Sequence, residues 1–284
     1  KHLNNHNVQC DLFADDTSIH TADKDISSVS KDLQQSLDDV SSWCSENSMI
    51  VHPVKTKSMV IATRQRHQLK PLVLNLTLNG NPIEQVNEHR LLGVTVDSQL
   101  KWQTHVETVC KTVSKSLFML AKLKPFTDID TRKMFYNAHV RSHIDYASTV
   151  WDGCGDVHLK RLDSLNRRAA KLIVPDINLT TDQKMEAAGM LSLHNHFSYN
   201  KGVFMHKIWN QKTPAYLTHF FKQSESSFGE FNRLFIVPRT RIDIFKSSLS
   251  FAGASLWNAL PFSLKTTSSL ARFKVNLFKY LSSS

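Results

Sequence analysis

The chain has 284 residues, which is enough for one large domain or two modest domains with real hydrophobic cores. Hydrophobic residues make up 41% of the chain and charged residues 21%, which is ordinary for a globular protein. No apolar run approaches the length of about 18 residues that a membrane-spanning helix needs, so we expect no membrane span and no membrane partner.

The cysteines and the charges narrow the possible class of protein further. The four cysteines lie far apart and form no CxxC pair, which argues against a disulfide scaffold or a zinc ribbon. We therefore expect an intracellular protein, nuclear or cytoplasmic and not secreted. Residues 1–62 carry 5 basic and 9 acidic residues, net −4, whereas residues 63–174 (17 and 10) and 175–284 (13 and 6) are each net +7. An acidic start before a basic body suits a protein that processes a polyanion, although charge that only serves solubility explains it equally well.

The first predicted element is a β-hairpin over residues 8–19. Apolar residues run up to Phe13, two adjacent carboxylates follow, and the chain becomes apolar again at Ile19, which predicts Asp15 and Asp16 at the tip. Adjacent carboxylates repel each other, and a divalent cation such as Mg²⁺ would relieve that repulsion. The alternative is a solvated Asp-Asp turn.

A helix and a second hairpin should come next. Apolar residues at helical spacing from Ile26 to Cys44 predict one amphipathic helix that lies across the sheet. Residues 49–61 read as two short strands around a polar turn that holds Lys55. Lys55 is then either a group that faces the active site or an ordinary surface lysine.

Two further hairpins are predicted before residue 102. Leucines alternate over residues 72–79 and end at an Asn79-Gly80 turn signal. The block LLGVTVDSQLKW follows at residues 91–102, where Gly93 would let the backbone approach a sugar-phosphate closely beside Leu92. An ordinary core hairpin, with Leu92, Val94 and Val96 facing inward, is the alternative.

From Trp102 the periodicity becomes helical, and three amphipathic helices are expected before Pro175. Their basic residues fall off the apolar faces and suit phosphate contacts, or simply solvent exposure. The candidates for contact with nucleic acid on these helices are Lys111, Lys115, Lys122, Arg167 and Arg168. The C-terminal third predicts a helix from Leu193 to Gln211, an extended basic stretch at residues 233–241 and a terminal amphipathic helix.

The order of these motifs resembles the C-terminal half of the reverse transcriptase of non-LTR, LINE-type, jockey-like retrotransposons. The motifs are FADD at residues 13–16, the Lys-Thr turn, LLGV…W, HIDYASTVW at 143–151 and WNALP at 257–261. The resemblance implies an α+β fold: a partial palm with antiparallel β-hairpins and one packed helix, then a mostly α-helical thumb and C-terminal region. The implied divisions are a palm with primer-grip hairpin at 1–102, a thumb-like region at 103–175 and a helical region of unknown role at 176–284.

The same resemblance implies an RNA-directed DNA polymerase, encoded by a transposable element, that uses two Mg²⁺ ions. Asp15 would be a metal ligand, Asp16 a second or supporting carboxylate, and Lys55 the general acid for the leaving pyrophosphate. The partners would be an RNA template and a DNA primer or an RNA/DNA hybrid, with deoxynucleotides as substrates if the full palm is present. Two departures are His52, where the family usually has Asn, and Leu91, where it prefers an aromatic residue.

The first catalytic carboxylate and the fingers of this family precede the hairpin, and only 14 residues stand before Asp15. The chain also begins at Lys1 without a start Met, so we expect a piece of a longer protein that does not polymerise by itself. The competing hypothesis is a non-catalytic module, derived from a retrotransposon, that binds nucleic acid or a protein partner. It predicts salt-dependent binding that does not change when Asp15 is replaced by alanine.

Overall fold

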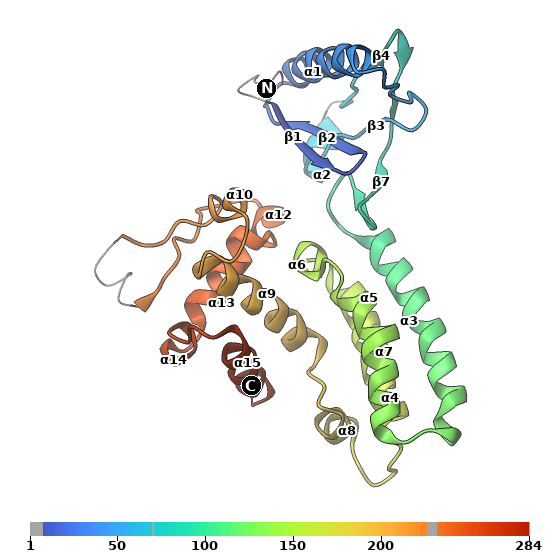
Figure 1. The fold of residues 1–284 in the computed structure, drawn as a ribbon, viewed down its shortest axis with the longest axis vertical. Coiled ribbons are helices and arrows are strands. Elements are labelled where there is room, and N and C mark those ends of the chain that lie inside the picture. Colours follow the sequence, from blue (N-terminus) through green and yellow to red (C-terminus); the bar gives the residue numbers. More distant parts are fainter. Residues whose placement is uncertain (1–7, 70, 226–231, 284) are drawn as a thin grey trace. The chain divides into compact units, whose positions relative to one another are not determined.

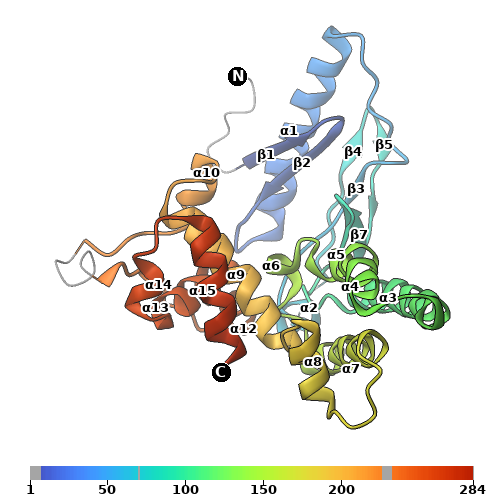
Figure 2. The same ribbon diagram turned by 60° about the horizontal axis from the view of Figure 1, so that its bottom comes forward.

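The computed structural model describes residues 8–69, 71–225 and 232–283. It is a mixed α/β structure, mostly helical with small antiparallel hairpins (Figure 1 and Figure 2). Contacts group the chain into two compact units, Lys1–Leu100 (unit 1) and Lys101–Ser284 (unit 2), and each is described by itself. The mixed fold with hairpins was predicted, and the palm and thumb identities stay predictions.

Unit 1 begins with the expected hairpin. Strands β1 (Val8–Phe13) and β2 (Asp16–Thr21) are antiparallel, and Phe13 pairs with Asp16. The two-residue turn is therefore Ala14-Asp15, and Ala14 takes a positive φ of 52°. Asp15 lies in the turn itself, whereas Asp16 is the first residue of the returning strand.

The core of unit 1 lies between a helix and the alternating leucines. Helix α1 (Ile26–Glu46) places its apolar face against buried Leu74, Leu76 and Leu78. The backbone then turns at Asn79-Gly80, where both residues have positive φ, between β4 (Thr77–Leu78) and β5 (Asn81–Pro82). This is the turn geometry that an Asn-Gly pair favours. The helix, the alternation and the turn were all predicted correctly.

The predicted second hairpin at residues 49–61 is wrong. The turn exists, but Met49 to Val51 form no strand, and β3 (Lys57–Ser58) instead pairs in parallel with β6 (Glu84–Gln85). Pro53 has no amide hydrogen to offer a strand ladder. The Lys57 ammonium and the Glu84 carboxylate form an ion pair across the parallel ladder, which favours this partner over the preceding segment. Helix α2 (Arg64–Leu69) follows and was not predicted.

The last hairpin of unit 1 joins β7 (Glu88–Leu91) to β8 (Val94–Asp97) through a two-residue turn, Leu92-Gly93. Both turn residues have positive φ, 45° and 85°. Leu92 is 42% exposed, so the alternative in which Leu92 faces inward is wrong, whereas Val94 is buried. A leucine in left-handed backbone is strained, and this strain marks the tip of the hairpin as unusual.

Unit 2 opens with the helices expected before Pro175. Helix α3 (Gln103–Leu123) continues into a short 3₁₀ turn, η1 (Lys124–Phe126), and α4 (Ile129–Tyr136) begins at Asp128. The Asp128 carboxylate accepts a hydrogen bond from the Thr131 amide at 2.8 Å, as a helix cap should. The helix then passes through a π turn, η2 (Asn137–Arg141), into α5 (Ser142–Asp145).

The remaining helices of the described part of unit 2 are α6 (Ser148–Trp151), α7 (Asp156–Ile173), α8 (Thr181–Ala188), α9 (Leu193–Trp209), α10 (Ala215–Thr218), α12 (Asp243–Lys246), π-helical η3 (Leu249–Gly253), α13 (Ala254–Ala259), α14 (Phe262–Lys265) and α15 (Leu270–Ser282). Helix α9 contacts α6, α7, α13, α15 and η3. Helix α7 of the expected thumb-like region contacts α8 and α9 of the expected C-terminal region. The functional division at residue 175 stays a prediction.

The C-terminal part of unit 2 has an aromatic core. Trp257 is completely buried and lies beside Trp209, Phe235 and Phe273. Its indole Nε1 donates to the Arg233 carbonyl at 2.8 Å, and Asn258 exchanges hydrogen bonds with both backbone groups of Phe235. The WNALP motif therefore fastens the extended stretch after residue 232 to α13.

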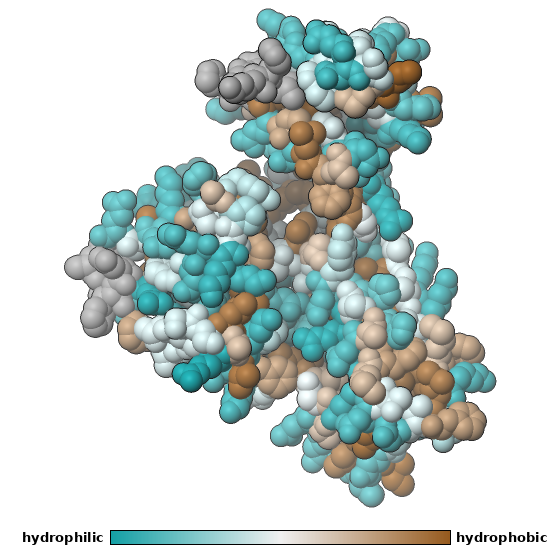
Figure 3. All heavy atoms as spheres, viewed as in Figure 1, coloured by the Kyte–Doolittle hydropathy of each residue, from teal (hydrophilic) through white to brown (hydrophobic). Residues whose placement is uncertain are grey.

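The surface of unit 2 is apolar at one end. Figure 3 shows hydrophobic side chains at the end of unit 2 that holds the α3–α4 turn. Phe126 in η1 is 86% exposed, and Met134 in α4 is 65% exposed. Among the described residues, none of the helices combines the length and the apolar character needed to cross a membrane.

Candidate functional site

The predicted metal ligands lie at the exposed tip of the β1–β2 hairpin. Asp15 and Asp16 are both exposed, and the apolar side chains of Leu12 and Phe13 beside them are 73% and 64% exposed. Among the residues that the structure describes, no group of three or more His, Cys, Asp or Glu side chains could hold a metal ion. Mg²⁺ is commonly held by one or two carboxylates together with water and substrate phosphates. The pair thus fits a partial magnesium site that needs further ligands.

Lys55, the predicted general acid, lies in an exposed turn. The His52 carbonyl accepts hydrogen bonds from the amides of Lys55 and Thr56, both at 3.1 Å, and from the Thr56 hydroxyl. His52 therefore closes this turn through its backbone carbonyl. The same turn could form with another side chain, such as the Asn that the family usually has. Lys55 forms no hydrogen bond or ion pair with Asp15 or Asp16.

The basic candidates on α3 share one helical face. Lys111, Lys115 and Lys122 are exposed and follow each other at near-helical spacing, on the opposite side from buried Val113. The Lys122 ammonium lies 5.6 Å from the centre of the Phe118 ring, a cation–π contact on the same exposed face. Within the described ranges, Lys111 and Lys115 have no acidic partner.

Helix α7 packs directly along α3 and adds cations of its own. The charge of Arg161 lowers the pKa of the α3 thiol Cys110, against a larger rise from burial, so Arg161 lies close to α3. Arg168 is exposed two turns further along α7 and has no ion pair with any described residue. The two helices together present cations that are free to meet an external anion.

Arg167 differs from the other basic candidates because its guanidinium is already paired with two carboxylates. Its guanidinium binds the Asp163 carboxylate through Nε at 2.9 Å and the Asp182 carboxylate through Nη1 at 2.8 Å. These hydrogen bonds raise the pKa of Arg167 and tie α7 to α8. The sequence prediction treated it as equivalent to Arg168, because the partner Asp182 is 15 residues away.

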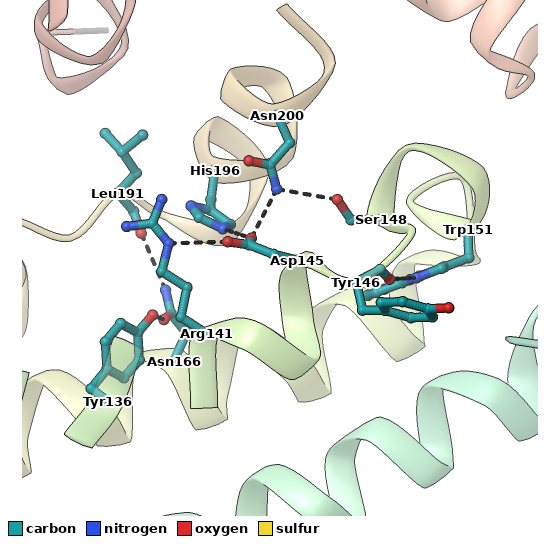
Figure 4. Close-up of polar contacts among 10 residues, drawn as sticks. All are labelled: Tyr136, Arg141, Asp145, Tyr146, Ser148, Trp151, Asn166, Leu191, His196 and Asn200. Atoms are coloured by element: carbon teal, nitrogen blue, oxygen red, sulfur yellow. Dashed lines mark hydrogen bonds and ion pairs between the residues drawn. The ribbon is translucent and has the colours of Figure 1, made fainter. Parts of the chain in front are cut away.

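A polar network that sequence reasoning missed lies where α5, α6 and α9 meet (Figure 4). The Asp145 carboxylate binds the His196 Nε2 atom, Arg141 Nε at 3.1 Å and Asn200 Nδ2 at 2.9 Å. Burial raises the pKa of Asp145, but the hydrogen bond and charge of His196, with Asn200 and Arg141, outweigh it and lower the pKa overall. Asn200 also donates to the Ser148 hydroxyl at 3.1 Å.

This network explains the block HIDYASTVW in structural terms. Asp145 fastens the block to α9, Ala147 turns the chain with a positive φ of 50°, and the Trp151 indole donates to the Tyr146 carbonyl at 2.9 Å (Figure 4). Trp151 is then completely buried against His105 and Phe197. The resemblance motif singles out Asp145 and Trp151 in the sequence, but it gives no sign of their partners on α9.

Comparison with known proteins shows a distant sequence similarity to a transposon polymerase. No family model and no solved structure matches it. A curated relative does match and gives the chain a distant reverse transcriptase-like relationship. This relative is the "Probable RNA-directed DNA polymerase from transposon BS" of Drosophila melanogaster, 22% identical over 164 residues. The match covers 57% of this chain but only 18% of the length of that protein.

Proposed function

We propose that the chain is part of an RNA-directed DNA polymerase, and that helices α3 and α7 bind the phosphate backbone of its nucleic acid. The relationship to a transposon polymerase supports the polymerase origin. One observation carries the binding function: Lys111, Lys115 and Arg168 are exposed cations without an acidic partner in the described part of the chain. Cations of this kind release counterions when they meet phosphates.

In this proposal the hairpins of unit 1 form the end of a palm with its primer grip, and α3, α4 and α7 form a thumb. The duplex of RNA template and DNA primer lies along α3, with Lys122 and Phe118 as one contact, and deoxynucleotides bind near the β1–β2 hairpin. The strained turn Leu92-Gly93 supports a role at the primer end, because backbone strain gathers at functional positions. Arg167 is left out, since Asp163 and Asp182 already neutralise it.

Magnesium belongs to the same proposal. When bound, two Mg²⁺ ions would activate the primer 3′-hydroxyl and hold the triphosphate. Asp15 would be a ligand and Asp16 a second or supporting carboxylate, and both are exposed and adjacent. Lys55, which has no acidic partner in the described ranges, would give a proton to the leaving pyrophosphate.

The binding function is tested by removing the charges of α3. We expect the triple variant Lys111→Gln, Lys115→Gln, Lys122→Gln to bind an RNA/DNA hybrid at least about tenfold more weakly at low salt. The slope of log affinity against log salt should fall by about 2 to 3, since each lost phosphate contact removes about 0.9. Fluorescence anisotropy over a salt series measures both quantities, and glutamine preserves the helix propensity of lysine.

A matched control separates the α3 face from net charge. Helix α15 carries three basic residues that are also exposed, so the variant Arg272→Gln, Lys274→Gln, Lys279→Gln removes the same charge elsewhere on unit 2. It should lose much less affinity. Equal losses in the two variants, or an unchanged salt slope in the α3 variant, would contradict the proposed contact surface.

Primer extension tests the catalytic part. We expect no extension by these 284 residues alone on a primed RNA template with Mg²⁺, because Asp15 and Asp16 provide a partial metal site only. Hybrid binding should persist in Asp15→Ala. Extension products from the wild type that disappear in Asp15→Asn would refute this expectation and show that these 284 residues polymerise with the help of Asp15. Salt-dependent binding that requires Asp15 would exclude the non-catalytic module as an alternative.

A further inference from the structure

Unit 2 contains a small polar pocket that no part of the proposed function uses. It lies between the α4–η2 helix, the segment that joins α8 to α9, and α15, and its volume is about 90 Å³. A cavity needs roughly 10–15 Å³ on this scale to hold one water, so the pocket has room for a group of several non-hydrogen atoms. Its polar lining comes from Lys133, Asn137, Arg141 and His196, and Phe278 contributes an apolar wall.

The polar lining is cationic and only partly neutralised. The Asp145 carboxylate accepts a hydrogen bond from Arg141 Nε and also binds His196 Nε2. The two terminal nitrogens of Arg141 point away from Asp145 in Figure 4, and neither they nor the His196 Nδ1 atom has a hydrogen-bond partner in the described ranges. Lys133 has no ion pair there either. Two permanent cations and an imidazole thus line one pocket beside a single carboxylate.

Hydrogen bonds hold the walls of the pocket in place. The Tyr136 hydroxyl donates to Asn166 Oδ1 at 2.7 Å, and Asn166 Nδ2 donates to the Leu191 carbonyl at 3.1 Å (Figure 4). Asp145 fixes Arg141 and His196 through the same carboxylate. Donors fixed before the ligand arrives lose little conformational entropy on binding.

We propose that this pocket binds a phosphate group through Lys133 and Arg141, with His196 as part of the wall. A guanidinium with two free terminal nitrogens suits a tetrahedral oxyanion, and Lys133 adds a mobile ammonium. The phosphate comes either from free phosphate or a nucleotide, or from a nucleic-acid strand. The inference is independent of the α3 contact surface, because none of these side chains belongs to that face.

Inorganic phosphate is the probe that tests the site. Titration into the full 284-residue chain, at ionic strength matched with chloride, should raise the melting temperature saturably. In Lys133→Gln, the apparent dissociation constant should rise about tenfold, as expected for one lost charge-assisted hydrogen bond. Lys133 is the residue to change because it takes no part in the Asp145 network. Lys274→Gln, an exposed lysine of α15, should bind phosphate like the wild type.

The outcomes are distinguishable. No saturable effect beyond that of chloride, or equal phosphate binding by Lys133→Gln and the wild type, would overturn the site. Uridine should not bind where uridine monophosphate does, and binding of the bare nucleoside would also overturn it. Competition between a short oligonucleotide and phosphate would support the site with strand phosphate as its ligand. Phosphate binding without that competition would support it with free phosphate or a nucleotide as ligand.

Discussion

Replacing Trp257 with alanine is expected to lower the free energy of unfolding of unit 2 by about 4 kcal/mol. The side chain is 0% exposed and its ring lies 5.8 Å from Trp209 and 6.0 Å from Phe235, centre to centre. Alanine would leave a cavity among these rings and would orphan the Arg233 carbonyl that the indole binds. Urea denaturation followed by circular dichroism and tryptophan fluorescence measures the loss.

Two variants give this result its meaning. Trp257→Phe keeps an aromatic ring and removes the indole nitrogen, so it should cost clearly less, about 1 to 3 kcal/mol. Phe262→Ala removes an aromatic ring that is 46% exposed and should cost less again. A loss below about 1 kcal/mol for Trp257→Ala would show that the aromatic core of unit 2 is not as closely packed as described.

The second large effect is expected at Asp145. Asp145→Ala should cost about 3 kcal/mol, because it leaves donors of His196, Arg141 and Asn200 without their common acceptor. This magnitude allows for the partial exposure of the carboxylate, 33%, which lets water replace some of the lost bonds. The same urea experiment applies. Asp145→Asn retains an acceptor oxygen and should lie between the wild type and Asp145→Ala.

Acid pH provides an independent check on Asp145. The pKa of its carboxyl is lowered in the folded chain, so its contribution to stability is present above the unfolded value of about 4 and is lost as pH falls through the folded pKa. The difference between wild type and Asp145→Ala should therefore shrink on acidification below about pH 4. Asp130→Ala is the control, since Asp130 is exposed and has no ion pair among the described residues. If the difference in unfolding free energy between the wild type and Asp145→Ala stayed constant at all pH values, the ionised carboxylate would not be the source of that stability.

Local patterns predicted the longer helices and three of the hairpins. The Asn79-Gly80 turn and the apolar face of α1 each depend on neighbouring residues, so the sequence contains the information directly. The parallel pairing of Lys57 with Glu84 depends on residues 27 positions apart, and the pattern at 49–61 favoured a local hairpin instead. Long-range pairing of this kind competes with local alternatives that look equally good in the sequence.

The candidate site divides in the same way. Exposure of Lys111 and Lys115 followed from the period of α3, because an amphipathic helix turns its polar residues outward. The neutralisation of Arg167 by Asp182 could not be predicted, since it requires knowing that α8 returns to α7. The Asp145 cluster was unpredictable for the same reason, because His196 lies 51 residues away along the chain. Roles that arise from packing between distant helices need the structure.

The π turn η2 has a consequence for comparing this chain with its relatives. A π turn carries one residue more than the α-helical turn it replaces, and this one lies between Tyr136 and Ser142. If the same residues instead formed an uninterrupted α-helix, everything downstream would be rotated by about 100°, which would swing Asp145 away from α9. A relative that keeps the Asp145 cluster with an uninterrupted helix should therefore show a one-residue gap within residues 137–141. An ungapped alignment through this helix would shift every residue after it by one position.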